Sequence, residues 1–148
     1  MTADSLFALA NNLVLPAWLL LVIAPGGERT PRLVHAAWLP MLLGGASLGL
    51  ALLGPGAPEG ADFSTLPGVM RLFESPVAVL AGWIHYLVFD LFVGAWEVRD
   101  ARRRGVSHLW VVPCLVVTLM LGPAGLLLYL GIRVFQTGET TLVESAGS

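Results

Sequence analysis

The stretch "WIHYLVFDLFVG", residues 83–94, decides the fold class, because it is apolar enough for a membrane helix and yet contains His85 and Asp90. An aspartate at the centre of a membrane helix costs about 2.5–3.5 kcal/mol on insertion scales. Such residues face the interior of a helix bundle or a water-filled cavity, and each is therefore a candidate for a functional role. The simpler alternative is an aspartate that only fastens two helices through a hydrogen bond.

The composition around this stretch is typical of a membrane protein. Of the 148 residues, 56% are hydrophobic and 12% are charged, whereas soluble domains carry about 25% charged residues. The mean hydropathy is +0.79. Four apolar runs are each long enough to cross a bilayer, which takes about 20 helical residues: residues 6–24, 33–53, 76–98 and 108–134. We therefore predict an all-α fold, an integral membrane bundle of four transmembrane helices, with residues 1–135 as its single domain and residues 136–148 as a short flexible tail.

The first apolar run is predicted to be a retained helix rather than a cleaved signal peptide. Its leader "MTADS" contains Asp4 but no basic residue, and no small-residue cleavage pattern follows the run. Cys114 is the only cysteine, which excludes an internal disulfide. The net charge of −2 gives no indication of a nucleic-acid partner, so membrane lipids are the partners that we expect.

The arginines indicate how the helices are oriented. All eight basic residues are arginines, and six of them lie in the two loops at residues 25–32 and 99–107. In a chain of four spans these loops share one side, which the positive-inside rule places in the cytoplasm. We therefore predict a multi-pass protein of the cell inner membrane with both termini outside the cytoplasm.

The loop before the third apolar run contains a short helix signal. In "STLPGVMRLFES", residues 64–75, Ser64 or Thr65 can cap a helix and Pro67 is tolerated in its first turn. Apolar residues then recur with helical spacing at Leu66, Val69, Met70 and Phe73. We predict a short interfacial helix, with a plain linker as the alternative.

Glycines and prolines inside the runs predict close packing and bends. Gly44, Gly45 and Gly49 give the second run a surface that a neighbouring helix can approach closely. A homo-oligomer through this surface is one expectation. The "GPAG" sequence at residues 122–125 can bend the fourth run.

Helical geometry separates two stripes along the third run, at about 100° per residue. The first stripe carries Trp83, Tyr86, Asp90, Gly94 and Glu97, and the second carries His85, Phe89, Phe92 and Trp96. His85 lies about 140° from Asp90 around the helix, so the two side chains cannot touch in a straight helix. They could flank one elongated ligand or contact different neighbouring helices.

Further polar residues of the apolar runs fall at a depth similar to that of Asp90. An unpaired amide in hydrocarbon is costly, so we predict one polar cluster at mid-depth, made of Asn11, Asn12, His85, Tyr86, Asp90 and Thr118. The alternative is a set of separate hydrogen bonds between helices. A polar cluster beside an aromatic stripe suits a long apolar ligand with one polar end. The predicted ligand-binding residues are Asn11, Asn12, Phe89, Trp96 and Thr118.

No metal or cofactor site is predicted. His35 and His108 fall at helix ends far from His85, so the three histidines do not converge. A small inner cluster of His35, Glu97 and His108 is an alternative, although side chains that reach the membrane surface explain these residues more simply. No phosphate loop, nucleophile motif or redox cysteine pair occurs in the sequence.

The segment "GWIHYLVFDLFVGAWEVRDA", residues 82–101, followed by "SHLWVVPCLVVTLMLGPAGLLLYL", residues 107–130, resembles the abscisic-acid-deficient-4-like family of small membrane proteins. The opening "LANNLVLPAWLLLVIAP" and the loop "LFESP" fit the same pattern, so the resemblance covers most of residues 6–133. Val88, Ala95 and Glu97 depart from the plant-like motif, which has Ala, Arg and an apolar residue there. A long N-terminal transit segment is also missing, and we therefore expect a bacterial member.

The resemblance implies a function as well. Plant members are described as neoxanthin synthases of plastid membranes, whose reaction isomerises the 5,6-epoxide of violaxanthin to an allenic alcohol. Such a reaction needs an acid to protonate the epoxide oxygen and a base to take a proton from the adjoining polyene carbon. By this resemblance His85 would be the base and Asp90 or Tyr86 the proton donor, with no cofactor.

Two functions follow as expectations. The first is an intramembrane isomerase of a carotenoid or related isoprenoid lipid. The alternative is a non-catalytic membrane protein that binds a pigment or lipid, or supports a partner complex. A transporter is a weaker third choice, because four short spans offer no inverted-repeat signature.

Overall fold

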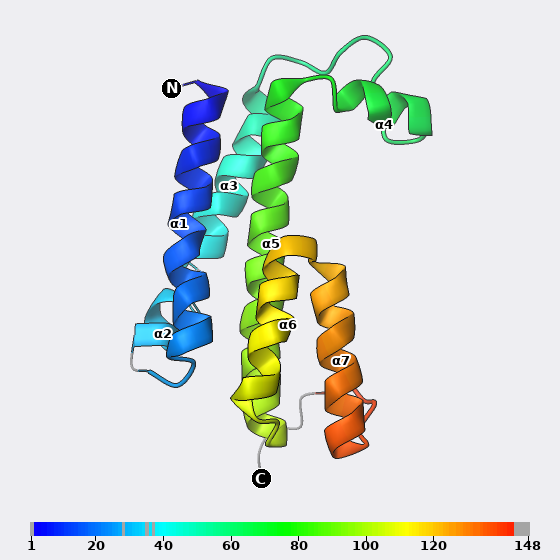
Figure 1. The fold of residues 1–148 in the computed structure, drawn as a ribbon. Helices are drawn as coiled ribbons and strands as arrows, with labels where there is room; N and C mark the ends of the chain where they lie inside the picture. Colours follow the sequence, from blue (N-terminus) through cyan, green and yellow to red (C-terminus); the bar gives the residue numbers. More distant parts are fainter. Residues whose placement is uncertain (1, 28, 35, 37, 144–148) are drawn as a thin grey trace.

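The computed structural model describes residues 2–27, 29–34, 36 and 38–143, and all regular structure in these ranges is helical. The helices are α1 (Ala3–Ile23), α2 (Arg29–Leu33), α3 (Trp38–Leu53), α4 (Leu66–Leu72), α5 (Pro76–Arg104), α6 (His108–Leu121) and α7 (Pro123–Thr137) (Figure 1). No strand occurs in the described ranges. The prediction of an all-α fold is confirmed.

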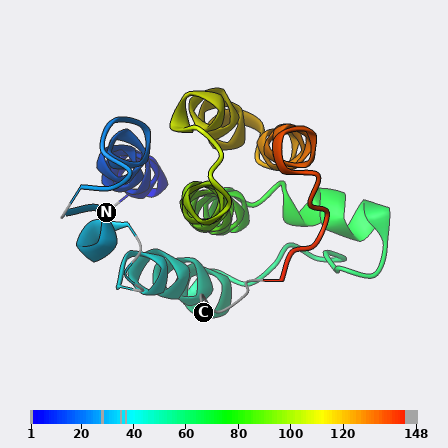
Figure 2. The same ribbon diagram turned by 90° about the horizontal axis from the view of Figure 1, so that it is seen from below.

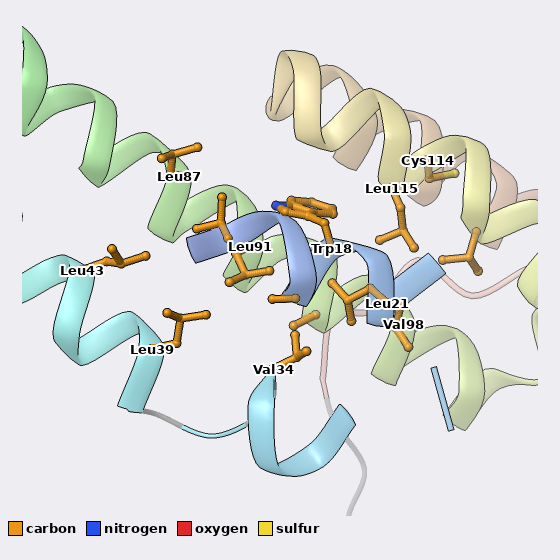
Figure 3. Close-up of a cluster of buried hydrophobic side chains, with 14 of the residues drawn as sticks. Trp18, Leu21, Val34, Leu39, Leu43, Leu87, Leu91, Val98, Cys114 and Leu115 are labelled. Carbon is orange, nitrogen blue, oxygen red and sulfur yellow. The ribbon is translucent and has the colours of Figure 1, made fainter. Parts of the chain in front are cut away.

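Helix α5 is the centre of the fold. Seen along the bundle axis, it is surrounded by α1, α3, α6 and α7 (Figure 2), and it packs against each of them. One hydrophobic core joins these helices (Figure 3), and its members include Trp18, Leu21, Leu39, Leu43, Leu91, Val98 and Leu115. The neighbouring helices cover much of α5, although Phe89 and Phe92 stay exposed, and they decide where its buried polar side chains point.

Local sequence signals set the two ends of α5. Ser75 is the N-cap, and its hydroxyl accepts a hydrogen bond from the Ala78 N–H at 3.4 Å. Pro76 occupies the first turn, where its missing N–H has no helical partner to lose. Gly105 ends the helix in the left-handed conformation at φ +72°, which glycine adopts without strain. The helix has 29 residues and continues past the predicted end at residue 98.

Gly94 lets α1 approach α5 closely. A Cβ atom at this position would lie 2.7 Å from Cη2 and Cζ3 of Trp18 and 3.3 Å from a methyl carbon of Leu115. Trp18 is only 3% exposed, so its ring is enclosed and has little room to move away. The contact fixes the spacing of α1, α5 and α6.

Replacing Gly94 with alanine should therefore destabilise the bundle by about 1–3 kcal/mol, the usual cost of overpacking a core. The measurement is thermal unfolding of the purified protein in detergent, followed by circular dichroism. Gly82→Ala is the matched control, because Gly82 lies on the same helix and no atom lies within 4 Å of its added Cβ. Equal stability of the two variants would contradict the close contact.

The prediction of a single span over residues 108–134 is wrong. The chain instead forms two helices, α6 and α7, which pack against each other as an antiparallel hairpin (Figures 1 and 2). At 1.5 Å per residue they are about 21 and 23 Å long, shorter than the roughly 30 Å hydrocarbon core of a bilayer. The hairpin therefore extends along only part of α5.

The GPAG sequence at residues 122–125 explains the reversal. Gly122 has φ +40° and ψ −94°, a conformation that L side chains rarely adopt. Pro123 cannot donate the hydrogen bond that would continue α6, but it fits the first turn of a new helix. Gly125 brings the helices into backbone contact, since a Cβ there would lie 2.5 Å from the Cα of Thr118. The sequence predicted that this motif bends one helix. In the structure it instead separates two helices, α6 and α7.

The hairpin places the two ends of the described chain at opposite ends of the bundle (Figure 1). Residues 139–143 lie beside the end of α5 that carries residues 102–104, which we call the arginine end. There Arg104 pairs with Glu139 and donates to the carbonyl oxygens of Thr141 at 3.0 Å and Val143 at 3.3 Å. The prediction that both termini lie on one side is therefore wrong, because the turn at Gly122 reverses the chain once more. The predicted flexible tail begins within α7, and its residues 144–148 lie outside the described residues.

In the described chain two helices, α1 and α5, are long and apolar enough to cross a membrane. The second predicted span, residues 33–53, contains the end of α2 and then α3, which has 16 residues. Four full-length transmembrane helices, as predicted, are thus not found. Helix α3 and the two hairpin helices are shorter than the predicted spans.

The predicted short helix in the loop before α5 is confirmed as α4. Thr65 is its N-cap, and the Thr65 hydroxyl accepts a hydrogen bond from the Gly68 N–H at 3.1 Å. Just before it, Asp62 accepts hydrogen bonds from the hydroxyl and the N–H of Ser64 and from the N–H of Thr65, and these bonds lower the pKa of Asp62. Helix α4 projects from the side of the bundle (Figure 1), with exposed apolar side chains at Leu66, Met70 and Phe73.

Candidate functional site

One face of α5 carries a row of buried acidic side chains. Asp90 is 7% exposed, Glu97 is fully buried, and Asp100 is 1% exposed. Each lies against the α6–α7 hairpin, as the contacts below show. Carboxyl groups are rarely buried unless they are paired, so this face is the candidate functional site.

Asp90 lies at the tip of the hairpin. A Cβ added to Gly122 would lie 2.6 Å from Oδ1 of Asp90, so only a glycine turn leaves room for this carboxyl group. Tyr86, one helical turn earlier on α5, is half-buried and its hydroxyl interacts with Asp90. The second carboxyl oxygen, Oδ2, is buried and has no hydrogen-bond partner among the described residues. Asp90 therefore keeps one acceptor available at the end of the hairpin.

Glu97 lies two turns further along α5, between α5 and α6. Its Oε1 accepts a hydrogen bond from the Thr118 hydroxyl at 2.9 Å. Thr118 is fully buried and belongs to the turn of α6 that contacts Gly125. The other oxygen, Oε2, is buried and unpaired within the described part of the chain.

Asp100 is the centre of a hydrogen-bonded charge network at the arginine end. Its Oδ2 accepts a hydrogen bond from the Tyr129 hydroxyl at 2.7 Å and pairs with Arg133 at 3.2 Å. Its Oδ1 pairs with Arg104 at 2.9 Å. Arg133 is 1% exposed and Tyr129 is fully buried. Removing one partner of such a buried ion pair destabilises a protein strongly, because the other charge is left buried without compensation.

The structure brings some of the predicted site residues together and separates others. Tyr86 and Asp90 share the site at the hairpin tip. Thr118 instead bonds Glu97, nearer to the arginine end. His85 is exposed and stacks beside Phe89, with ring centroids 4.5 Å apart and Phe89 56% exposed. His85 thus lies on a different face of α5 from Asp90, as the helical spacing indicated.

The remaining predicted residues take part in separate contacts. Asn11 of α1 accepts a hydrogen bond from the Trp83 indole at 3.3 Å, which ties α1 to α5. Asn12 is exposed and lines a groove on the other side of α1. Trp96 is half-buried and meets Tyr129 edge to face at 5.6 Å. The predicted single cluster is therefore divided: Asn11 and Thr118 make separate hydrogen bonds between helices, whereas Tyr86 and Asp90 lie on the same helix.

Sequence reasoning missed the network around Asp100. Its signal was available, since Tyr129 and Arg133 are four residues apart and share a helix face within an apolar run. A charged residue inside such a run is a candidate for a functional role. The predicted fourth span, residues 108–134, instead places Arg133 at its outer end, across the membrane from Asp100.

A groove lies between α1 and α6. It has a volume of about 510 Å³ and is lined by Asn12, Leu15, Pro16, Trp18, Leu19, Val22, Leu115, Val116 and Leu119. The indole N–H of Trp18 is buried and has no acceptor among the described residues. A second hollow of about 240 Å³ lies between the start of α3 and α5 and is lined in part by Phe92 and Arg99.

The inner histidine cluster considered from the sequence is not assembled in the described residues. His108 Nε2 bonds the carbonyl oxygen of Val22 at 2.9 Å, whereas Glu97 bonds Thr118. His35 lies outside the described residues. Among the described side chains no group of three or more His, Cys, Asp or Glu residues is placed to hold a metal ion.

These features define a class: a small helical protein with two membrane-length helices, a short helical hairpin, and a row of buried carboxyl groups facing that hairpin. Sequence comparison gives the family. A family model described as ABA DEFICIENT 4-like matches residues 5–129, and the chain belongs to this family. The matched part includes the polar face of α5 and the turn at residues 122–125, so the resemblance found in the sequence is confirmed.

A curated plant protein shows the same relationship. Protein ABA DEFICIENT 4, chloroplastic, from Arabidopsis thaliana is 31% identical to the chain over 113 residues, which cover 71% of this chain and 51% of that protein. The chain thus spans about half the length of the curated relative that it matches. No solved structure matches the chain.

Proposed function

We propose that this protein is a membrane-embedded isomerase that acts on a carotenoid or a related isoprenoid lipid, with Asp90 as its proton-transferring group. The observation that carries the proposal is the buried Asp90 carboxyl at the hairpin tip, one oxygen of which has no partner among the described residues. Membership in the ABA DEFICIENT 4-like family supports a carotenoid-related role.

Placement in a membrane is supported by the surface of the bundle. In the most apolar part of α1 only 28% of residues are buried, and in that of α5 only 39%, whereas the core helix of a soluble protein is mostly buried. Large apolar side chains face outward on several helices, among them Leu19, Met41, Leu48, Phe92, Val116 and Leu127. Exposed apolar surface on this scale suits contact with lipid. The positive-inside rule then places the arginine end in the cytoplasm, with the N-terminus of α1 on the opposite side.

Asp90 then lies near mid-depth. It is 14 residues from either end of α5, which is about 21 Å at 1.5 Å per residue. The hairpin covers the face of α5 on the arginine side of Asp90 and ends beside it. The buried carboxyl therefore lies where the part of α5 that the hairpin covers ends.

The isomerisation of an epoxide carotenoid moves one proton and leaves the elemental composition of the substrate unchanged. A base takes a proton from the carbon next to the epoxide, a carbon–carbon double bond forms as the carbon–oxygen bond breaks, and the oxygen gains a proton. Asp90 can accept the proton through its unpaired oxygen, and Tyr86 beside it can donate one to the oxygen. His85, implied as the base by family resemblance, lies on another face of α5. We therefore propose Asp90 in that role.

The test is expression in a host that accumulates epoxide carotenoids, followed by chromatography of the pigments. Asp90→Asn should lower conversion by about 100-fold or more, as expected for loss of a group in acid–base catalysis, while the thermal stability in detergent is retained. His85→Gln is the matched control on the same helix and should leave conversion unchanged. Conversion that survives Asp90→Asn but is lost in His85→Gln would refute this assignment.

A second candidate function is supported by the groove between α1 and α6. An apolar groove of about 510 Å³ could hold a pigment or lipid without any reaction. In that case a pigment should copurify with the protein and be recovered unchanged.

A homo-oligomer stays a prediction. The surface at Gly44, Gly45 and Gly49 is open to a second copy of the chain, because a Cβ added at any of them would meet no other described part of the chain within 4 Å.

A further inference from the structure

The hollow of about 240 Å³ between the start of α3 and α5, which we call the Arg99 hollow, lies on the arginine side of the bundle. It occurs where α3 begins, because α3 runs beside the half of α5 that is nearer to α4 (Figure 1). Arg99 is the one charged side chain among the described residues that line it. The rest of this lining is apolar: Val34, Ala36, Pro40, Leu91, Phe92 and Ala95.

The wall that α5 contributes runs from mid-depth toward the membrane surface. Leu91, Ala95 and Arg99 are each four residues apart, a spacing that places side chains above one another on one helix face. With Asp90 at mid-depth, Leu91 lies about 2 Å and Arg99 about 14 Å from the middle of the membrane. Half of the hydrocarbon thickness is about 15 Å. The apolar wall therefore lies at the depth of the lipid chains, and Arg99 lies at their boundary with the headgroups.

The charges near this boundary favour an anionic group. Arg102 and Arg103 are exposed and follow Arg99 by three and four residues, so they extend its helix face toward the arginine end. The described acidic side chains at this end, Asp100 and Glu139, are already paired with other arginines. Arg99 also interacts within the protein, but a guanidinium has five N–H donors in a fork that matches a phosphate group.

The size of the hollow favours part of a lipid over a complete small molecule. Ligand pockets usually enclose about 300–1,000 Å³, which is more than this hollow offers. Phe92, on its wall, is 57% exposed, so the hollow borders the surface that faces lipid. An acyl chain fits these conditions, because only part of its length has to be enclosed and the rest of the lipid remains in the bilayer.

We propose that the Arg99 hollow binds an anionic phospholipid, with one acyl chain against Leu91, Phe92 and Ala95 and the headgroup phosphate on Arg99. Basic pockets between membrane helices bind anionic headgroups on the cytoplasmic side, which is the side that the positive-inside rule gives to the arginine end. The inference rests on the membrane placement that accompanies the proposed function. It does not involve Asp90 or the isomerisation.

The experiment measures which lipids stay bound when the purified protein is released from nanodiscs. The nanodiscs contain equal amounts of phosphatidylglycerol, which is anionic, and phosphatidylcholine, which is zwitterionic, and native mass spectrometry counts the lipids that the protein retains. The wild type should retain phosphatidylglycerol in about 5-fold excess, the effect expected for one arginine beside an anionic headgroup. This measurement does not depend on the folding of any variant.

Variants of Arg99 then test the assigned contact. Arg99→Gln removes the positive charge and should remove most of the preference for phosphatidylglycerol. Arg99→Lys keeps the charge without the planar fork and should show an intermediate preference. Arg71→Gln is the matched control, because it removes the same charge from α4, at the opposite end of the bundle, where Arg71 does not line the hollow. Its preference should equal that of the wild type.

A competitor without acyl chains tests the apolar part of the site. Glycerol phosphate carries the phosphate of the lipid but has nothing to place against Leu91 and Phe92. An excess of it should therefore leave the retained phosphatidylglycerol in place. Displacement by glycerol phosphate would indicate a site for a free phosphate ester and would overturn the assignment to a lipid.

Two other outcomes would overturn the inference: equal retention of both lipids by the wild type, or a preference that survives Arg99→Gln. Neither result bears on the conversion of an epoxide carotenoid, which is measured separately with Asp90→Asn. A protein that selects phosphatidylglycerol through Arg99 but converts no carotenoid would contradict the isomerase and leave the lipid site intact. Conversion that needs Asp90, in a protein without lipid preference, would contradict only the lipid site.

Discussion

Replacing Asp100 with asparagine is expected to destabilise the protein by about 3–5 kcal/mol, the usual cost of removing one partner from a buried ion pair. Asparagine keeps the shape of the side chain but leaves the Arg133 guanidinium, 1% exposed and 3.2 Å from Asp100, without its counter-charge. The Tyr129 hydroxyl, which donates to the same oxygen, keeps only a neutral acceptor. The midpoint of thermal unfolding in detergent measures the loss.

The control for this prediction is Glu139→Gln. Glu139 pairs with Arg104 at the same end of the bundle, but its side chain is 53% exposed, and exposed ion pairs contribute only about 0–1 kcal/mol. A double variant with Asp100→Asn and Arg133→Gln should lose less than the sum of the two single losses, because removing both charges leaves neither unpaired. Asp100→Asn with the stability of Glu139→Gln would show that the network does not hold α7 to α5.

Replacing Gly125 with alanine is expected to cost about 3 kcal/mol or more, at the upper end of overpacking penalties. The added Cβ would meet Thr118 at its hydroxyl, its backbone nitrogen and its Cα, the last at 2.5 Å. A side chain can rotate away from such a clash, but a helix backbone cannot, so α6 and α7 must separate. Thr118 would then move from Glu97, with which it shares a hydrogen bond of 2.9 Å.

Gly131→Ala is the matched control for the hairpin. Gly131 lies on the same helix and is exposed, and no atom of the described chain lies within 4 Å of its added Cβ. It should unfold at or above the wild-type temperature, since alanine favours a helix over glycine by about 1 kcal/mol. A Gly125→Ala protein as stable as Gly131→Ala would be incompatible with backbone contact between α6 and α7.

Both predictions concern the packing that supports the candidate site. Gly125 holds the hairpin closed, and the hairpin tip at Gly122 encloses Asp90. Asp100 anchors the other end of α7 to α5. A variant that loosens either contact should therefore also lower any activity at Asp90, and only variants with retained stability, such as the proposed Asp90→Asn, can separate chemistry from folding.

The helical class, and two helices long and apolar enough to cross a membrane, followed from the sequence because they depend on local composition. Residues 6–24 and 76–98 are continuous apolar runs, and the structure has α1 and α5 there. The α4 helix followed from its cap at Thr65. The separation of His85 from Asp90 also followed, since it needs only the helical period.

The fourth run could not be resolved in the same way. A glycine–proline pair inside an apolar run is compatible with a kink, a break or a full reversal, and local propensity does not distinguish them. The outcome depends on the close backbone contact of Gly125 with Thr118 and on the ion pair between Arg133 and Asp100. The paired residues are 33 positions apart in the sequence. Treating residues 108–134 as one span caused three errors: in the number of spans, in the position of the C-terminal end and in the placement of Arg133.

The sequence by itself determined that the chain is helical, strongly apolar and centred on a helix with an ionisable face, because hydropathy and helical periodicity are properties of neighbouring residues. Only the tertiary structure decided what that face meets: a helical hairpin in place of a single fourth helix, a charge network at Asp100, and an environment in which one oxygen of Asp90 has no partner among the described residues. The physical reason is that a buried polar group is stable only beside its partners, and those partners lie on helices distant in the chain.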